Sequence, residues 1–227
     1  KSLYQNEVPD HPGGGTVTWT NRWNEYHYVD DIEAREDGGT PAFLQTIRAA
    51  LTLKLKEQMG VENIMKREHE LAERTFFELE KIPGLHLLAG EQRERIGVFS
   101  FYIDNIHHNL FVKLLNDRYG VQVRGGCSCA GTYGHYLLHV DKETSHRITE
   151  KINKGDLEDK PGWTRLSIHP TMTNDELDII LKGIKEITEN IDSWKKDYYF
   201  DRHTGEFFHK EMPRKTPEFF DSWFEIE

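Results

Sequence analysis

The segment Arg124–Gly131 combines two thiols with three glycines. Glycines let the backbone turn tightly, so a loop of this kind can present a reactive side chain at its tip. The thiols belong to Cys127 and Cys129, and a cysteine acts as a nucleophile in its thiolate form. Nearby cations, such as Arg124 or a protonated His135, would favour that form. The sequence therefore indicates a thiol-bearing active-site loop.

Two other interpretations of the cysteines stay open at this point. Small buried cysteines behave as inert hydrophobic residues, and composition alone favours this more common situation. A zinc site is the other alternative, with ligands from Cys127, Cys129, His135 and His139. Structural zinc sites usually leave at least two residues between paired cysteines, whereas a single residue separates these two. We therefore expect no metal.

A second candidate is Arg165, which lies inside the strand-like run Trp163–Ser167. An arginine inside a strand usually has a partner, and its planar guanidinium can hold a carboxylate through two parallel hydrogen bonds. This pattern indicates a substrate that carries a carboxylate. The alternative, an edge-strand charge that pairs with Asp175 or with solvent, is about as common.

A third candidate is the turn formed by Gly38, Gly39, Thr40 and Pro41. Backbone N–H groups and a hydroxyl at the start of a helix attract phosphate. Thr40 would be the N-cap of the helix and Pro41 its first residue. Ordinary caps are far more common than phosphate sites, so both interpretations stay open. The glycine run 13–15 is a weaker signal of the same kind.

These candidates occur in the order of four motifs of a known family. The chain resembles the C-terminal part of pyridoxal-phosphate enzymes of aminotransferase class V, the group that contains the cysteine desulfurases. The matching motifs are Gly13–Val17, Arg35–Pro41, Arg124–Ala130 and Thr164–Ser167. The resemblance covers roughly residues 10 to 190 and leaves out the aromatic tail.

The resemblance implies a role for each candidate. The residues that match Gly39 and Thr40 bind the phosphate of pyridoxal 5′-phosphate in the neighbouring subunit of a homodimer. The arginine that matches Arg165 binds the carboxylate of a small amino-acid substrate, and the arginine that matches Arg124 lies close to the loop cysteine. In desulfurases the cysteine that aligns with Cys129 carries the substrate's sulfur as a persulfide.

The chain departs from the family pattern in two ways. Desulfurases usually carry His where Cys127 and Ser128 stand, and the Cys-x-Cys arrangement is more similar to that of a molybdenum-cofactor sulfurase. The family's Schiff-base lysine precedes the glycine-rich turn, and no lysine of this chain matches it. We therefore expect the C-terminal portion of a longer pyridoxal-phosphate transferase, an aminotransferase or a cysteine desulfurase, that is inactive on its own.

The elements around these motifs predict an α/β fold. Helices are expected over residues 40–59, 62–80, 107–119 and 173–191, the last with a capping box of Thr173 and Glu176. Strands are expected over residues 85–88, 96–103, 121–123 and 163–168. The alternation indicates a small mixed or antiparallel sheet covered by helices on one side, the small C-terminal domain of a fold type I pyridoxal-phosphate enzyme.

We expect four regions along the chain. Residues 1–39 would form the edge of the large domain, residues 40–82 the connecting helices and residues 83–192 the small α/β domain. Residues 193–227 form an acidic, aromatic tail, in which two aromatic runs flank His203–Gly205. This pattern favours a small hairpin that packs on the rest of the chain. A competing hypothesis makes the tail part of a non-catalytic module that binds a protein partner.

The composition narrows the classes of function. The 227 residues include 29 Lys and Arg against 39 Asp and Glu, a formal net charge of −10, so the chain would repel a nucleic-acid backbone. No apolar run approaches the roughly 18–20 residues that span a bilayer. The spacing of the two cysteines disfavours a disulfide, which indicates a reducing compartment. We therefore expect a cytoplasmic protein without a nucleic-acid or membrane partner.

Overall fold

The computed structural model describes residues 6–127, 129–212 and 223. The chain divides into two compact units, Lys1–Val61 and Glu62–Glu227, and each is described by itself. Three aromatic residues of the tail, Phe219, Phe220 and Phe224, lie outside the described residues. Among the helices that the structure describes, none has the length and apolar character that a membrane span requires.

The N-terminal unit consists of a short hairpin and two helices. Strands β1 (Val17–Thr20) and β2 (Tyr26–Tyr28) pair antiparallel, and helices α1 (Ile32–Glu36) and α2 (Phe43–Met59) follow. The side chain of Asp31 caps α1 by accepting the N–H of Ala34. Helix α2 ends at Gly60, as the sequence predicts, and Gly60 has the positive φ of 81° that favours glycine at a helix end.

The start of α2 differs from the sequence-based prediction. Thr40 is not the N-cap and Pro41 is not helical, because the N-cap is Ala42 and makes no side-chain cap bond. The N–H of Phe43 donates to the carbonyl of Pro41 at 2.8 Å, and this tight turn delays the first helical turn. The hydroxyl of Thr40 is therefore not used by the helix, and the residue is exposed.

The apolar residues of α2 recur at helical spacing but remain exposed. None of the residues of α2 is buried, and its large apolar side chains lie open to solvent in the described chain: Phe43, Leu44, Ile47, Leu51 and Leu55. The helix thus has the predicted apolar spacing. Such spacing usually indicates a buried face, but the described residues do not bury this one.

The C-terminal unit is built on a four-stranded antiparallel sheet. Its strand order is β3 (Leu85–Leu87), β4 (Val98–Ile103), β6 (Trp163–Ser167) and β5 (Arg124–Gly126). Every neighbouring pair in this sheet runs antiparallel, which confirms one of the two sheet types expected from the sequence. The predicted strand over 121–123 is wrong, because the glycine-containing segment Arg124–Gly126 pairs with β6 instead.

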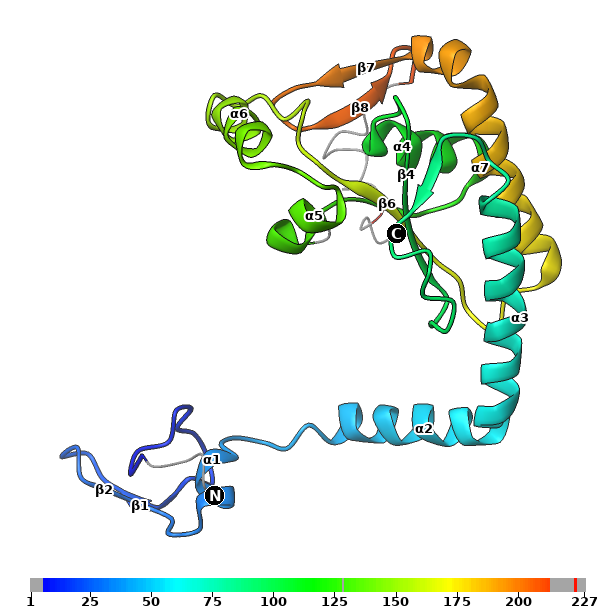
Figure 1. The fold of residues 1–227 in the computed structure, drawn as a ribbon. Coiled ribbons are helices and arrows are strands. Elements are labelled where there is room, and N and C mark those ends of the chain that lie inside the picture. The colour runs from blue at the N-terminus through cyan, green and yellow to red at the C-terminus, as the bar shows by residue number, and fades with distance from the viewer. Residues whose placement is uncertain (1–5, 128, 213–222, 224–227) are drawn as a thin grey trace. The chain divides into compact units, whose positions relative to one another are not determined.

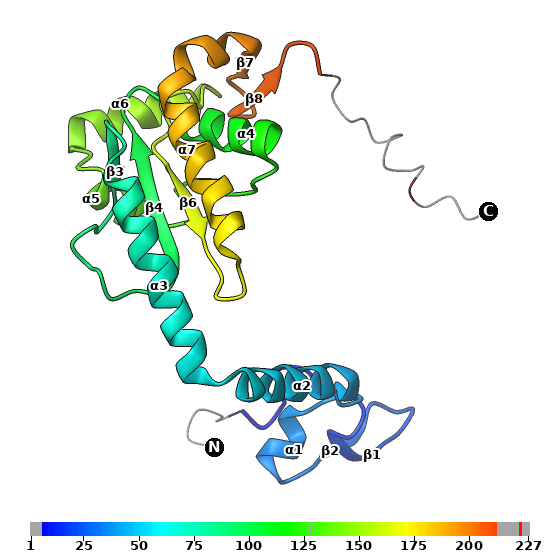
Figure 2. The ribbon, with the colours of Figure 1, turned by 90° about the vertical axis from the view of Figure 1, so that its right-hand side faces the viewer.

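Three long helices cover one face of this sheet. Helices α3 (Val61–Leu79), α4 (His108–Tyr119) and α7 (Asn174–Trp194) enclose one hydrophobic core with the sheet (Figure 2). The capping box of Thr173 and Glu176 starts α7, as predicted. Gly120 ends α4 with a left-handed backbone. The helices therefore leave the other face of the sheet available for functional side chains.

The alternation of burial along β4 distinguishes the face of the sheet that packs in the core from the opposite face. Phe99 and Phe101 are fully buried in the core, whereas Ser100 between them is only half-buried. Ser100 lies directly opposite Arg165 of β6, and residues directly opposite in antiparallel strands share a face. The side chain of Arg165 therefore belongs to the face that α3, α4 and α7 do not cover.

Two helices in this unit were not expected from the sequence. Helices α5 (Gly131–Leu137) and α6 (Lys142–Asn153) lie on the side of the sheet away from α3 and α7 (Figure 1). At this side Trp163 is buried, and a Cβ on Gly134 of α5 would lie 3.1 Å from its ring. Helix α5 thus covers one end of the otherwise open sheet face.

The predicted hairpin in the tail is confirmed. After the short helix η1 (Lys195–Asp197), strands β7 (Tyr198–Asp201) and β8 (Glu206–His209) pair antiparallel. The side chain of Asn109 at the start of α4 donates to the carbonyl of Gly205 at 2.6 Å, and the backbone N–H of Leu157 donates to Arg202 at 3.0 Å. The hairpin therefore packs on the body of the C-terminal unit.

Candidate functional site

Arg124 and Arg165 come together at the centre of the candidate site. They are direct partners in the antiparallel register of β5 and β6, so their side chains start from the same face of the sheet. Like charges at directly opposite positions destabilise a sheet. An anion that binds between or beside the two guanidinium groups would offset their repulsion.

The side chain of Arg165 is without a partner among the residues that the structure describes. Its side chain is half-buried, and no hydrogen bond or ion pair joins it to another residue in the described part of the chain. The alternative of a pair with Asp175 is therefore not realised among these residues. A half-buried guanidinium without a partner costs desolvation free energy that a bound carboxylate would offset.

Cys129 lies next to the first of these two arginines. The Nη2 atom of Arg124 donates to the Sγ atom of Cys129 at 3.5 Å, and Cys129 is exposed. Cys129 has a φ of 59°, the left-handed region that few residues other than glycine adopt. Such a conformation costs about 1–2 kcal/mol and is concentrated at functional sites. The backbone thus holds the thiol at an exposed position beside a cation.

Cys127 has different surroundings. It is half-buried and lines two cavities, one of about 140 Å³ against Trp163 and α6, and one of about 320 Å³ that Cys129 also lines. The side chain of His135 contacts the carbonyl of Gly131 at 2.9 Å and the hydroxyl of Ser145 at 2.9 Å. His135 therefore orders α5 and α6, although the sequence suggested it as a possible cation beside the thiols.

The described residues contain no ligand set for the zinc alternative. Within residues 6–127, 129–212 and 223, no three His, Cys, Asp or Glu side chains come together as a metal site would require. His135 is engaged with Ser145, and His139 has a left-handed backbone with φ of 52° at the end of α5. The thiol-loop interpretation needs no such ligand set.

The sequence did not single out His108, which lies behind the cysteine loop. Burial lowers the pKa of His108 to about 4, and the charges of His107 and Lys160 act in the same direction. The His107 and His108 rings stack at 4.4 Å, and burial lowers the pKa of His107 as well. A Cβ on Gly162 would lie 2.6 Å from the His108 ring, which shows how tightly this histidine is packed.

A backbone hydrogen bond joins the two glycine-rich motifs of the N-terminal unit, residues 13–15 and 38–39. The N–H of Gly39 donates to the carbonyl of Gly14 at 2.8 Å, and Gly39 has a φ of 93°. A Cβ on Gly38 would lie 2.6 Å from the carbonyl oxygen of His11, so this close approach requires glycine. The turn presents Thr40 to solvent. Gly39 and Thr40 belong to this unit, whereas Arg124, Cys129 and Arg165 belong to the other.

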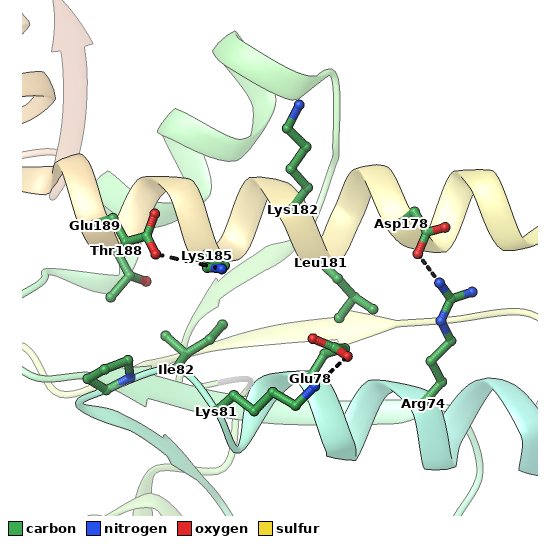
Figure 3. A pocket seen from close by; sticks show the side chains of 11 residues that line it. Arg74, Glu78, Lys81, Ile82, Asp178, Leu181, Lys182, Lys185, Thr188 and Glu189 are labelled. Carbon is green, nitrogen blue, oxygen red and sulfur yellow. Dashed lines mark hydrogen bonds and ion pairs between the residues drawn. The ribbon is translucent and has the colours of Figure 1, made fainter.

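Another groove of the C-terminal unit has charged side chains that are already paired with one another. It has a volume of about 780 Å³ and lies between α3 and α7 (Figure 3). Ion pairs join Arg74 to Asp178, and Lys81 to Glu78 at 2.8 Å. Lys185 is paired with Glu189 at 3.9 Å and Lys182 with Glu186 at 3.8 Å. Its cations therefore already have counter-charges, whereas Arg165 has none among the described residues.

The chain belongs to the class-V aminotransferase family, whose model matches residues 1–180. It is 29% identical over 131 residues to a probable cysteine desulfurase of Staphylococcus epidermidis and 27% identical over 131 residues to one of Staphylococcus aureus. Each alignment covers 57% of this chain but 31% of the relative. The chain therefore spans about a third of the length of these curated relatives. The resemblance noted in the sequence is confirmed.

Solved structures confirm the fold class. The apo cysteine desulfurase of Thermococcus onnurineus NA1 matches with a TM-score of 0.56 at 23% identity, over 80% of this chain and 40% of that chain. The cysteine desulfurase CsdA of Escherichia coli matches with a TM-score of 0.55 at 17% identity, over 80% of this chain and 39% of that chain. The α/β architecture of a fold type I enzyme's C-terminal part is thus shown.

Proposed function

We propose that these residues form the C-terminal portion of a pyridoxal-phosphate enzyme that removes sulfur from cysteine and carries it on Cys129. The observation that carries this proposal is the group of Arg165, Arg124 and Cys129. The half-buried guanidinium of Arg165, which has no partner in the described part of the chain, lies opposite that of Arg124, which contacts an exposed thiol. An amino acid with a carboxylate at one end and sulfur at the other complements such a group.

Arg165 would bind the substrate's carboxylate. Two parallel N–H···O bonds from a guanidinium fix both the position and the plane of a carboxylate. Because Arg165 lies on the uncovered face of the sheet, the substrate would lie on that face, with its side chain directed toward the loop of Cys129. This binding orients the substrate and reduces the entropic cost of the reaction.

Cys129 would accept the sulfur atom. In the overall exchange a bond forms between Sγ of Cys129 and the sulfur of cysteine, and the bond between that sulfur and the Cβ of cysteine breaks. The products are alanine and a persulfide on Cys129, and no external oxidant is required. The adjacent guanidinium of Arg124 stabilises negative charge on the sulfur atoms during this exchange.

The proposal assigns the cofactor's phosphate to the N-terminal unit. Thr40 offers an exposed hydroxyl that the helix does not use, whereas the N–H of Gly39 is already bonded to Gly14. Thr40 would therefore contact the phosphate, and Gly39 would shape the turn that presents Thr40. When bound, pyridoxal 5′-phosphate supplies an electron sink for the substrate's α-carbon. We include in this proposal a homodimer, in which Thr40 serves the neighbouring subunit, and a cytoplasmic location.

The test compares serine variants of the two cysteines in the complete gene product that contains these residues. The enzyme is loaded with pyridoxal 5′-phosphate and given L-cysteine and dithiothreitol, and alanine and sulfide are measured. Cys129→Ser should lower both rates by at least about 100-fold, because the attacking thiol is lost. Cys127→Ser, the matched control, should stay within about threefold of the parent enzyme.

The same assay separates desulfuration from transamination. Transamination needs no thiol, so an aminotransferase would keep its amino transfer to a 2-oxo acid in the Cys129→Ser variant. Unchanged alanine and sulfide formation in this variant would remove Cys129 from the mechanism. Amino transfer to a 2-oxo acid without alanine or sulfide formation in the parent enzyme would make an aminotransferase the better account.

A further inference from the structure

A cavity beside the cysteine loop is lined in part by a segment of the chain that lies beyond the family match. It has a volume of about 320 Å³, and its lining includes Cys127, Cys129 and the hairpin residues Thr204, Gly205 and Glu206. The family model ends at residue 180, and the hairpin begins at Tyr198. This extension therefore gives the cysteine loop a wall that the family match does not include.

Contacts with α4 hold the hairpin beside the cavity. Besides the bond from Asn109 to Gly205, the hydroxyl of Tyr198 donates to Asp117 at 3.0 Å, and burial raises the pKa of Tyr198. The rings of Phe200 and Phe207 lie 5.2 and 5.3 Å from the ring of His107. Polar and aromatic contacts thus hold both strands against α4, so the turn between them keeps its place at the cavity.

The cavity contains charged side chains that form no ion pair among the residues that the structure describes. Arg124 and Lys160 supply two cations, and Glu206 supplies one carboxylate. None of the three takes part in an ion pair with another residue that the structure describes, and the contact of Arg124 is with the thiol of Cys129. The groove between α3 and α7 differs in this respect, since its cations are paired.

We propose that this cavity binds the acceptor of the sulfur atom, a small thiol that carries both carboxylate and ammonium groups. The proposal rests on the proposed function. Lys160 and Arg124 would bind the carboxylate, and Glu206 would bind the ammonium group. A volume of this order accommodates a ligand between an amino acid and a short peptide in size.

The transfer balances without an added oxidant or reductant. The thiolate of the acceptor attacks the outer sulfur of the Cys129 persulfide. A new S–S bond forms to the acceptor, the S–S bond to Cys129 breaks, and its electron pair stays on Sγ of Cys129. The acceptor leaves as a persulfide, and Arg124 lies beside the thiolate that is regenerated.

The test uses disulfide exchange at Cys129, which needs no cofactor. The Cys127→Ser chain is treated with cystine, cystamine or bis(2-hydroxyethyl) disulfide, and mixed-disulfide formation is followed by mass spectrometry. The rate with each reagent is divided by the rate of the urea-unfolded chain with the same reagent. This ratio corrects for differences in intrinsic reactivity among the reagents. Cystine, with both charged groups, should react on the order of tenfold faster than the neutral reagent, and cystamine, with ammonium groups alone, should not.

Charge variants show whether the cavity causes this preference. Lys160→Gln and Glu206→Gln should each lower the normalised preference for cystine by about threefold to tenfold. Lys154→Gln and Glu211→Gln are matched controls, because these exposed residues do not line the cavity, and they should keep the preference of the parent chain.

Equal normalised rates for the three reagents would overturn the proposal and would favour a macromolecular acceptor. An equal loss of preference in the control variants would also overturn it, since the effect would then come from net charge. Both results are distinct from failure of the proposed function, which is measured by alanine and sulfide formation with dithiothreitol, a neutral reductant.

Discussion

Arg124 of β5 and Arg165 of β6 lie directly opposite each other on neighbouring antiparallel strands, and Arg124 also contacts the thiol of Cys129 at 3.5 Å. Two like charges in this position weaken the sheet when no anion is bound. We therefore interpret the two arginines as an anion-binding site, in which a bound anion would offset the repulsion and stabilise the sheet.

This relationship predicts a stability gain when one charge is removed. Arg165→Gln should raise the free energy of unfolding of the chain by roughly 0.2–1 kcal/mol in low salt, measured by urea denaturation, because the like-charge repulsion is lost. Arg165→Lys keeps the charge and is the matched control. The difference between the two variants should shrink as salt is added. A Gln variant that is no more stable than the Lys variant would contradict the repulsion.

The left-handed backbone of Cys129 predicts that two variants without the thiol differ in stability but not in function. Cys129→Gly should be more stable than Cys129→Ser by about 1 kcal/mol, since glycine adopts a positive φ without steric cost. Both variants lack the thiol and should both fail to form a persulfide. Thermal or urea unfolding of the two variants measures the difference, and equal stability would show that the loop is not strained at this residue.

The buried histidine predicts a loss of stability in acid. The pKa of His108 is lowered to about 4 in the folded chain, below its ordinary value of 6.5. Between these values the unfolded chain binds a proton that the folded chain does not, so the free energy of unfolding falls as the pH falls from 6.5 to 4. The effect is on the order of 2–3 kcal/mol at its largest.

Urea unfolding at pH 7 and at pH 4.5 measures this dependence. His108→Gln should reduce the difference between the two pH values, whatever its stability at pH 7. His146→Gln, on the exposed side of α6, is the control and should keep the difference seen in the parent chain. The assignment to His108 fails if both variants show the same pH dependence.

The packing behind the cysteine loop predicts a strong effect of one added methyl group. A Cβ on Gly162 would lie 2.6 Å from His108 and 2.8 Å from the Cα of Gly126, so Gly162→Ala should destabilise the chain by about 1–3 kcal/mol. Gly131→Ala is the matched control, because a Cβ there meets nothing within 4 Å. Similar losses in both variants would argue against close packing at Gly162.

Local signals were sufficient to predict much of the C-terminal unit. The capping box of Thr173 and Glu176, the stop at Gly120 and the aromatic runs around His203–Gly205 act within a few residues, so the sequence reveals them directly. The four motifs in family order predicted the family itself, which the family model confirms.

Other features depend on tertiary contacts. The strand Arg124–Gly126 contains two glycines, which have little intrinsic strand preference, and it forms because β6 supplies the pairing. Helix α5 also contains two glycines and lacks a clear apolar face. The positions of Lys160 and Glu206 at the cysteine loop depend on chain segments far apart in sequence, so no local pattern could predict them.

The location of the sulfur atom after turnover tests the central claim most directly. The complete enzyme is given L-cysteine without reductant, exposed thiols are alkylated, and peptides that contain residues 124–131 are analysed by mass spectrometry. We predict one added sulfur atom on Cys129, present also in Cys127→Ser and absent in Cys129→Ser. Added sulfur that stays on the peptide in Cys129→Ser, or no added sulfur in the parent enzyme while alanine is formed, would contradict the account.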